Sequence, residues 1–78
     1  MCVICCSPKG TPQPNTTLIR RMFARNPHGA GYMYARDGKV TIHKGFMNID
    51  DLLRQLKAEH FTKADPVVYH FRISTQAG

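Results

Sequence analysis

The sequence predicts an α+β fold in which two helices pack on a β-sheet. Short segments rich in β-branched and aromatic residues predict four strands, and two longer segments carry apolar residues at helical spacing. Residues typical of turns, mainly proline and glycine, separate these segments. The predicted order of elements along the chain is therefore β-α-β-β-α-β.

The first half of the chain contains a strand, a loop and a helix. Residues 1–7 are apolar enough for a buried strand, and the prolines and glycine of residues 8–15 force a loop. Residues 16–25 predict a helix, for which Asn15 or Thr16 can provide the cap. Asn26 ends this helix, because the residue before a proline avoids the α region. Its apolar face consists of Leu18, Ile19, Met22 and Phe23.

A hairpin and a strand account for most of the second half. Residues 30–36 and 39–46 form the hairpin, because Asp37-Gly38 supplies a two-residue turn that permits positive φ. Residues 67–73 form a continuous apolar strand, which is typical of the centre of a sheet.

The second helix is predicted over residues 48–60. Asn48 can cap it, and Met47 and Leu52 are spaced for a hydrophobic contact across its first turn. Asp50 and Asp51 suit the positive end of the helix dipole. The stripe expected to face the sheet consists of Ile49, Leu52, Leu53 and Leu56.

Length and composition indicate one small domain spanning residues 1–78. A chain of this size buries only about 60% of the surface that its unfolded form exposes, so the core is thin. Hydrophobic residues make up 42% of the chain, which argues against disorder. We expect a cytoplasmic location with no membrane contact, because no long apolar run and no signal-peptide pattern stands in the sequence.

The chain is basic, with 11 Lys and Arg against five Asp and Glu and a formal net charge of +6. Small basic proteins often bind nucleic acid or acidic proteins. The charges are scattered, however, and only Arg20 and Arg21 are adjacent. A solvated positive surface is the simpler interpretation, so nucleic acid is not the partner we expect.

The cysteines, Cys2, Cys5 and Cys6, crowd into five residues. An odd count at this spacing does not make a disulfide framework, which supports a reducing compartment. Two of them at Cys-x-x-Cys spacing would provide half of a zinc site, but the four histidines are widely separated. A strand would also place Cys2 and Cys6 on one face and Cys5 on the other. We expect neither a metal nor a cofactor.

Cys2 follows the initiator methionine directly. Removal of that methionine would put a thiol and a free α-amine on one residue, and the amine titrates near pH 8. Such an amine is a general base for its own thiol, which is the arrangement of N-terminal nucleophiles. The simpler alternative is a small hydrophobic residue in a strand.

Two further segments carry candidate site residues. Residues 25–31 leave the first helix and enter a strand through two glycines, which let backbone approach another backbone or a ligand. Arg72 follows His70 by two residues in the last strand, so the two share a face. An arginine among apolar neighbours needs an anion, and a ligand carboxylate suits its planar fork. The alternatives are that residues 25–31 form only a tight turn, that Arg72 lies in water and that His70 has a structural role.

These three pieces, in this order, resemble the class II glutamine amidotransferase domain, an N-terminal nucleophile (Ntn) hydrolase. Family members begin Met-Cys-Gly-Ile, and residues 1–4 read Met-Cys-Val-Ile. A family loop of the type Arg-Gly-x-Asp-x-x-Gly is similar to residues 25–31, Arg-Asn-Pro-His-Gly-Ala-Gly. A family segment His-x-Arg-x-Ala-Thr-His-Gly is similar to residues 70–78, His-Phe-Arg-Ile-Ser-Thr-Gln-Ala-Gly. The resemblance covers the chain but only the front part of the family domain.

The resemblance implies hydrolysis of glutamine to glutamate and ammonia. Cys2 would be the nucleophile, with its own amine as base, and Arg72 would bind the α-carboxylate of glutamine. Thr75, with the backbone at Ile73 and Ser74, would line the same pocket. The residues implied to support the loop beside the nucleophile are Arg25, Gly29 and Gly31. We expect Cys2 and Arg72 to converge on one cleft.

The sequence departs from the family pattern at positions that affect the expected activity. Val3 replaces a glycine, and Gln76 stands where histidine is usual. The family's oxyanion-hole Asn-Gly pair and its amino-group-binding aspartate lie further downstream, and loss of one oxyanion donor costs ~10²–10³ in rate. We therefore expect a truncated, inactive domain that a homo-oligomer or a complementary segment completes. The alternative is a non-catalytic basic module that binds or inhibits an acidic protein or nucleic acid.

Overall fold

The computed structural model describes residues 2–74, which form an α+β fold with six elements. They are β1 (Cys2–Ser7), α1 (Thr16–Arg25), β2 (Ala30–Arg36), β3 (Lys39–Phe46), α2 (Ile49–Glu59) and β4 (Val67–Arg72). The order of elements expected from the sequence is confirmed. Neither helix in this part of the chain is long and apolar enough to cross a membrane.

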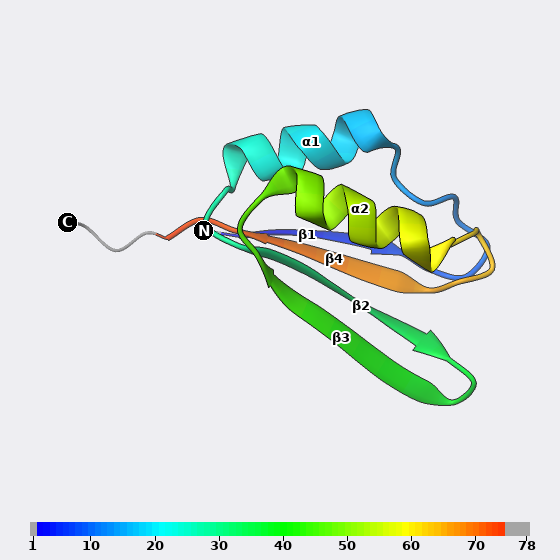
Figure 1. The fold of residues 1–78 in the computed structure, drawn as a ribbon. Coiled ribbons are helices and arrows are strands. Elements are labelled where there is room, and N and C mark those ends of the chain that lie inside the picture. Colours follow the sequence, from blue (N-terminus) through cyan, green and yellow to red (C-terminus); the bar gives the residue numbers. More distant parts are fainter. Residues whose placement is uncertain (1, 75–78) are drawn as a thin grey trace.

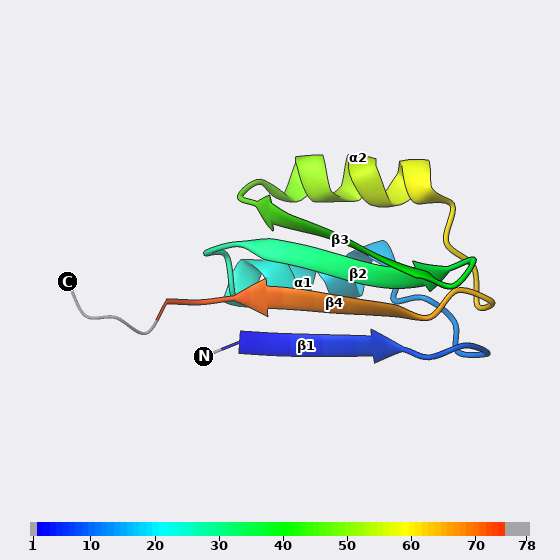
Figure 2. The ribbon, with the colours of Figure 1, turned by 90° about the horizontal axis from the view of Figure 1, so that it is seen from below.

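The four strands form one antiparallel sheet in the order β1-β4-β2-β3 (Figure 2). β4 lies between β1 and β2, so its predicted central position is confirmed. Both helices lie on the same side of the sheet (Figure 1). Residues 2–74 therefore form two layers, and within this part of the chain one face of the sheet has no helix over it.

The core lies between the helices and the sheet. Alternate strand residues point toward the helices, and Tyr32, Tyr69 and Phe71 are almost completely buried there. The helices contribute Ile19 and Phe23 from α1 and Leu52 from α2. The remaining buried hydrophobic residues are Ala30 and Val67.

Local signals set the ends of the elements. The Asn15 side chain accepts a hydrogen bond from the Leu18 amide at 2.8 Å, and Asn48 accepts from the Asp50 amide at 2.8 Å, so both predicted caps are confirmed. Asp37 and Gly38 have φ of 54° and 75°, as a two-residue hairpin turn requires.

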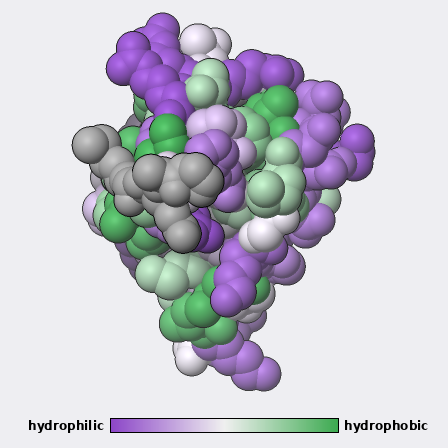
Figure 3. Space-filling view, turned by 90° about the vertical axis from the view of Figure 1, so that its left-hand side faces the viewer, coloured by the Kyte–Doolittle hydropathy of each residue, from purple (hydrophilic) through white to green (hydrophobic). Residues whose placement is uncertain are grey.

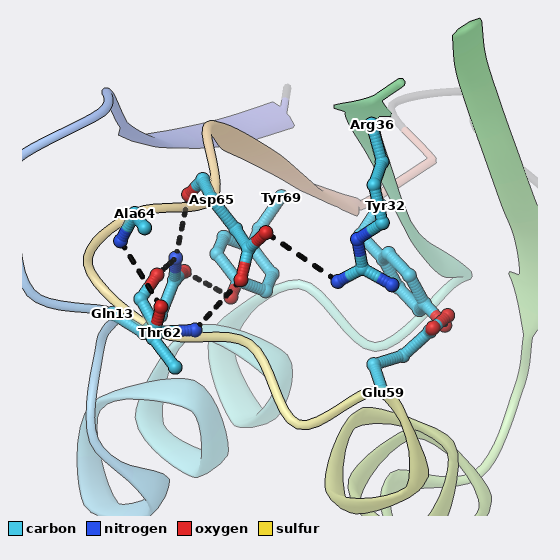
Figure 4. A network of polar contacts seen from close by, with 8 residues as sticks. All are labelled: Gln13, Tyr32, Arg36, Glu59, Thr62, Ala64, Asp65 and Tyr69. Carbon is cyan, nitrogen blue, oxygen red and sulfur yellow. Dashed lines mark hydrogen bonds and ion pairs between the residues drawn. The ribbon is translucent and has the colours of Figure 1, made fainter.

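A polar network joins the loop before α1 to the loop before β4 (Figure 4). The Tyr69 hydroxyl donates to Oε1 of Gln13 at 2.6 Å. The Gln13 amide nitrogen then donates to the carbonyl oxygens of Thr62 and Asp65, both at 2.9 Å. This network fixes the end of the sheet at which β4 begins.

Three sequence expectations about packing are wrong. Leu18 was placed on the apolar face of α1 but is 40% exposed, because Ile19 and Phe23 already fill the contact with the sheet. Met47 does not pack on Leu52: it is 68% exposed, and its sulfur lies beside Gly29. The first strand is not buried throughout, since it is an edge strand and Ile4 is 65% exposed on the face without helices.

Candidate functional site

The candidate site lies on the sheet face that the helices do not cover, here called the open face. The strand register places twelve positions on it, three from each strand. They are Cys2, Ile4 and Cys6 of β1; Val68, His70 and Arg72 of β4; Gly31, Met33 and Ala35 of β2; and Val40, Ile42 and Lys44 of β3. Seen from the end where the described chain begins, hydrophobic surface shows among the hydrophilic groups, including in the lower part of the molecule (Figure 3).

Cys2 and Arg72 are direct neighbours on the open face. They are paired Cα partners between β1 and β4, and both side chains are exposed. Side chains that are directly opposite in an antiparallel pair have Cβ atoms about 4.5–5.5 Å apart. The fold therefore brings together two residues that are far apart in the sequence.

The turn at His28 and Gly29 lies on the other side of Arg72. The His28 amide donates to the Arg72 carbonyl oxygen, and the Arg72 amide donates to the Gly29 carbonyl oxygen, both at 2.8 Å. The Ser74 amide donates to Nδ1 of His28 at 2.7 Å. These three hydrogen bonds fix the backbone on both sides of Arg72, so this turn is a positioning element of the site.

Glycine is required at two positions of this segment. Gly29 has a φ of +137°, a conformation that side chains disfavour. A Cβ on Gly31 would lie 2.8 Å from the His43 carbonyl oxygen and 3.0 Å from Cα of Lys44. The close approach to backbone expected from the sequence is thus present at Gly31, where β2 and β3 also shift register.

A groove of about 610 Å³ crosses the open face. Arg72, His28, Gly29 and Gly31 line it together with apolar residues such as Met33, and Cys2 is not among the lining residues. The groove is mainly apolar, and its basic groups gather where β4 ends. A ligand in the groove would therefore contact Arg72, whose strand partner Cys2 lies outside the groove lining.

The other predicted site residues have less defined positions. Arg25 is exposed at the last turn of α1, and within residues 2–74 its side chain makes no hydrogen bond or ion pair, so its supporting role stays a prediction. Asn26 instead closes this helix, because its buried side chain donates to the Met22 carbonyl oxygen at 3.2 Å. Ile73 and Ser74 follow β4 directly, and Thr75 lies outside the described residues.

The cysteines alternate between the faces as expected for a strand. Cys2 and Cys6 are exposed, whereas Cys5 packs against the core. Burial raises the pKa of the Cys5 thiol, and the neighbouring Cys6 raises it further. Across the described part of the chain, no group of three or more His, Cys, Asp or Glu is placed to hold a metal ion.

A second titratable cluster lies on the helix side and was not anticipated from the sequence. The Tyr32 hydroxyl donates to Oε2 of Glu59, and Nε2 of His43 lies 3.6 Å from the same oxygen. Burial raises the pKa of Tyr32, and the hydrogen bond to Glu59 adds to this. The sheet separates the side chains of this cluster from Cys2, although Tyr32 and His43 also line the groove on the open face.

His28 is the site residue that sequence reasoning missed. The sequence places it in the 25–31 segment and among four widely separated histidines, but neither pattern indicates a contact with Ser74. No known protein family, curated protein or solved structure matches this chain. The geometry of the open face and the sequence motifs are therefore the indications of function.

Proposed function

We propose that this chain is a class II glutamine amidotransferase-like domain with a partial Ntn-hydrolase-like sheet, and that Cys2 is its nucleophile. The observation that carries the proposal is the pairing of Cys2 with Arg72 on the open face. The resemblance implies the same two residues as nucleophile and carboxylate ligand. Their adjacency supports that reading because β1 and β4 are separated by most of the sequence.

Arg72 has the chemistry of a carboxylate ligand. Its side chain is exposed, and among residues 2–74 it has no acidic partner. A guanidinium fork binds a carboxylate through two parallel hydrogen bonds. The backbone on both sides of Arg72 is fixed, so this side chain starts from a defined position next to Cys2.

The proposed reaction uses Cys2 as the first residue of the mature chain. Its α-amine takes the thiol proton, and the sulfur attacks the side-chain amide carbon of glutamine. The amine then returns the proton to the leaving nitrogen, so that ammonia departs and a thioester remains. Water hydrolyses the thioester, which releases glutamate and restores the thiol.

Turnover by this chain alone should be slow. The motif resemblance places the oxyanion-hole donors outside the sequence, and the loss of one such donor reduces the rate by ~10²–10³. We expect no measurable ammonia release from glutamine. If wild-type protein released ammonia and Cys2→Ala did not, the oxyanion donors would have to come from another part of the chain or from a second chain.

Glutamine binding tests the proposal independently of turnover. We expect glutamine to shift the amide resonances of Val3 and Arg72 in the ¹⁵N-labelled protein. The analogue γ-aminobutyramide, which lacks the α-carboxylate, should not do so. Arg72→Lys should weaken binding about fivefold or more, because lysine is a point charge without a planar fork.

The matched control for this titration is Arg54→Lys on α2, an exposed arginine on the opposite layer. It should bind glutamine as the wild type does. Equal binding of γ-aminobutyramide, or unchanged binding by Arg72→Lys, would contradict the proposed role of Arg72.

A further inference from the structure

The open face exposes more apolar side chain than a small monomer usually does. Ile4, Val40 and Ile42 are 65%, 66% and 62% exposed, and Met33 is 41% exposed. The register places these four residues on one surface, with Val68 between them. A contiguous apolar patch on a protein surface commonly marks an interaction site.

The charges on this face are all of one sign. Lys44, His70 and Arg72 are its basic residues, and none of its twelve positions is acidic. The acidic residues lie elsewhere: Asp37 is at the hairpin tip, Asp50, Asp51 and Glu59 are on α2, and Asp65 is in the loop before β4. Three of these carboxylates have partners away from the open face: Asp51 pairs with Arg54, Asp65 with Arg36, and Glu59 with Tyr32 and His43.

This distribution of charge disfavours a second copy of the chain as the occupant. Two open faces brought together would bury Lys44 and Arg72 against apolar residues or against the same cations. Neither copy would supply a carboxylate, and a charge buried without a partner is costly. The occupant must therefore bring acidic groups of its own.

The position of the aromatic residues disfavours a single-stranded nucleic acid. All seven Tyr and Phe residues belong to the core or pack against it on the helix side. The open face thus has no ring on which a base can stack, and stacking supplies much of the affinity of such complexes. Aliphatic side chains such as Ile42 fit apolar protein side chains better.

We propose that the open face binds an acidic, amphipathic protein segment. Its apolar side chains pack on Ile4, Met33 and Ile42, and its carboxylates pair with Lys44 at the β3 edge. Charge complementarity then sets the orientation of the bound segment, and burial of its apolar side chains provides most of the binding affinity. The inference does not depend on glutamine hydrolysis, because Lys44 and Ile42 have no part in that reaction.

The test uses a synthetic helical peptide with leucine along one face and glutamate elsewhere, carrying a fluorophore. Its binding to the full chain is measured by fluorescence anisotropy. Lys44→Glu should weaken binding about fivefold or more by like-charge repulsion. Ile42→Ser should weaken it to a similar extent by loss of apolar contact. A shuffled peptide of the same composition, without an apolar face, should bind much more weakly.

Two control variants are matched to these changes. Lys57→Glu makes the same charge change on α2, and Leu18→Ser removes an exposed apolar residue from α1. Both should bind the peptide as the wild type does, and circular dichroism should show that all four variants are folded. If Lys57→Glu weakens binding as much as Lys44→Glu, or the shuffled peptide binds equally well, the proposal is wrong.

Other occupants give different results in the same protein. Sedimentation that shows a dimer in the wild type and a monomer in Ile42→Ser would assign the face to a second copy. Tighter binding to phosphatidylglycerol vesicles or to an oligonucleotide than to the peptide, lost in Lys44→Glu, would assign it to a lipid surface or a nucleic acid. Each of these results would overturn the proposal.

Discussion

Gly31 shows how one missing side chain permits the pairing of β2 with β3. A Cβ at this position would meet the backbone of His43, which cannot move without breaking the sheet. Gly38 differs, because a Cβ there meets nothing within 4 Å and only its φ of +75° is unfavourable. We expect Gly31→Ala to lower the free energy of unfolding by about 2 kcal/mol or more, and Gly38→Ala by about 1 kcal/mol. Urea denaturation measures both, and equal losses would contradict the steric account.

Because of Tyr69, we expect the stability of the protein to decrease with rising pH in the alkaline range. Burial raises the pKa of its hydroxyl, and the nearby Cys5 raises it further. A raised pKa in the folded state means that the neutral hydroxyl stabilises the fold below the unfolded pKa of about 10. This stabilisation is lost as the pH rises above that value.

Tyr69→Phe tests this dependence. At neutral pH the variant should lose about 1 kcal/mol of stability with the hydrogen bond to Gln13. Between about pH 9 and pH 11 its stability should fall less steeply than that of the wild type. Thermal unfolding across this range is the measurement, and identical slopes would show that Tyr69 does not titrate on unfolding.

Individual site residues could be predicted from the sequence, but their partners could not. Alternation along a strand places His70 and Arg72 on one face and separates Cys5 from Cys2, and the structure agrees. The contact of His28 with Ser74 depends on how a turn meets the end of another strand. No local pattern encodes such a contact.

At the scale of elements, the turn at His28 and Gly29 holds the end of β4. We expect His28→Ala to increase hydrogen exchange at the Ser74 amide, because the acceptor Nδ1 is removed. The amide of Arg72 should stay protected, since its acceptor is the Gly29 carbonyl oxygen. His70→Ala, an exposed change on the open face, is the control and should leave both amides unchanged. Unaltered exchange at Ser74 in His28→Ala would rule out this role.

The bounds of the elements were predictable because their signals are local. The caps at Asn15 and Asn48 and the Asp37-Gly38 turn act within a few residues, and the structure has these elements at the expected places. Packing was less predictable. Met47 has the right spacing for a contact with Leu52 but lies beside Gly29, which is distant in the sequence.

At the scale of the whole molecule, the strand order creates the candidate site. β1 pairs with β4 rather than with β2, and only this pairing makes Cys2 a neighbour of Arg72. Strand order depends on contacts between distant segments, so periodicity alone does not predict it. The same order gathers Lys44, His70 and Ile42 on the open face, where sequence reasoning expected only scattered charge.

Covalent labelling of Cys2 tests whether Cys2 and Arg72 belong to one glutamine site, and Cys6 provides an internal control. Both thiols are exposed on the same strand and face, but Cys2 is paired with Arg72 and Cys6 with Val68. The reagent is a glutamine-like diazoketone that retains the α-carboxylate, and peptide mass spectrometry gives the rate at each cysteine. Intact mass first establishes that Cys2 is the N-terminal residue.

We predict that Cys2 reacts faster than Cys6. Free glutamine should suppress this excess, Arg72→Lys should abolish it, and Arg54→Lys should leave it unchanged. Equal rates at the two cysteines, or an excess at Cys2 that persists in Arg72→Lys, would contradict the assignment of Cys2 and Arg72 to one glutamine site.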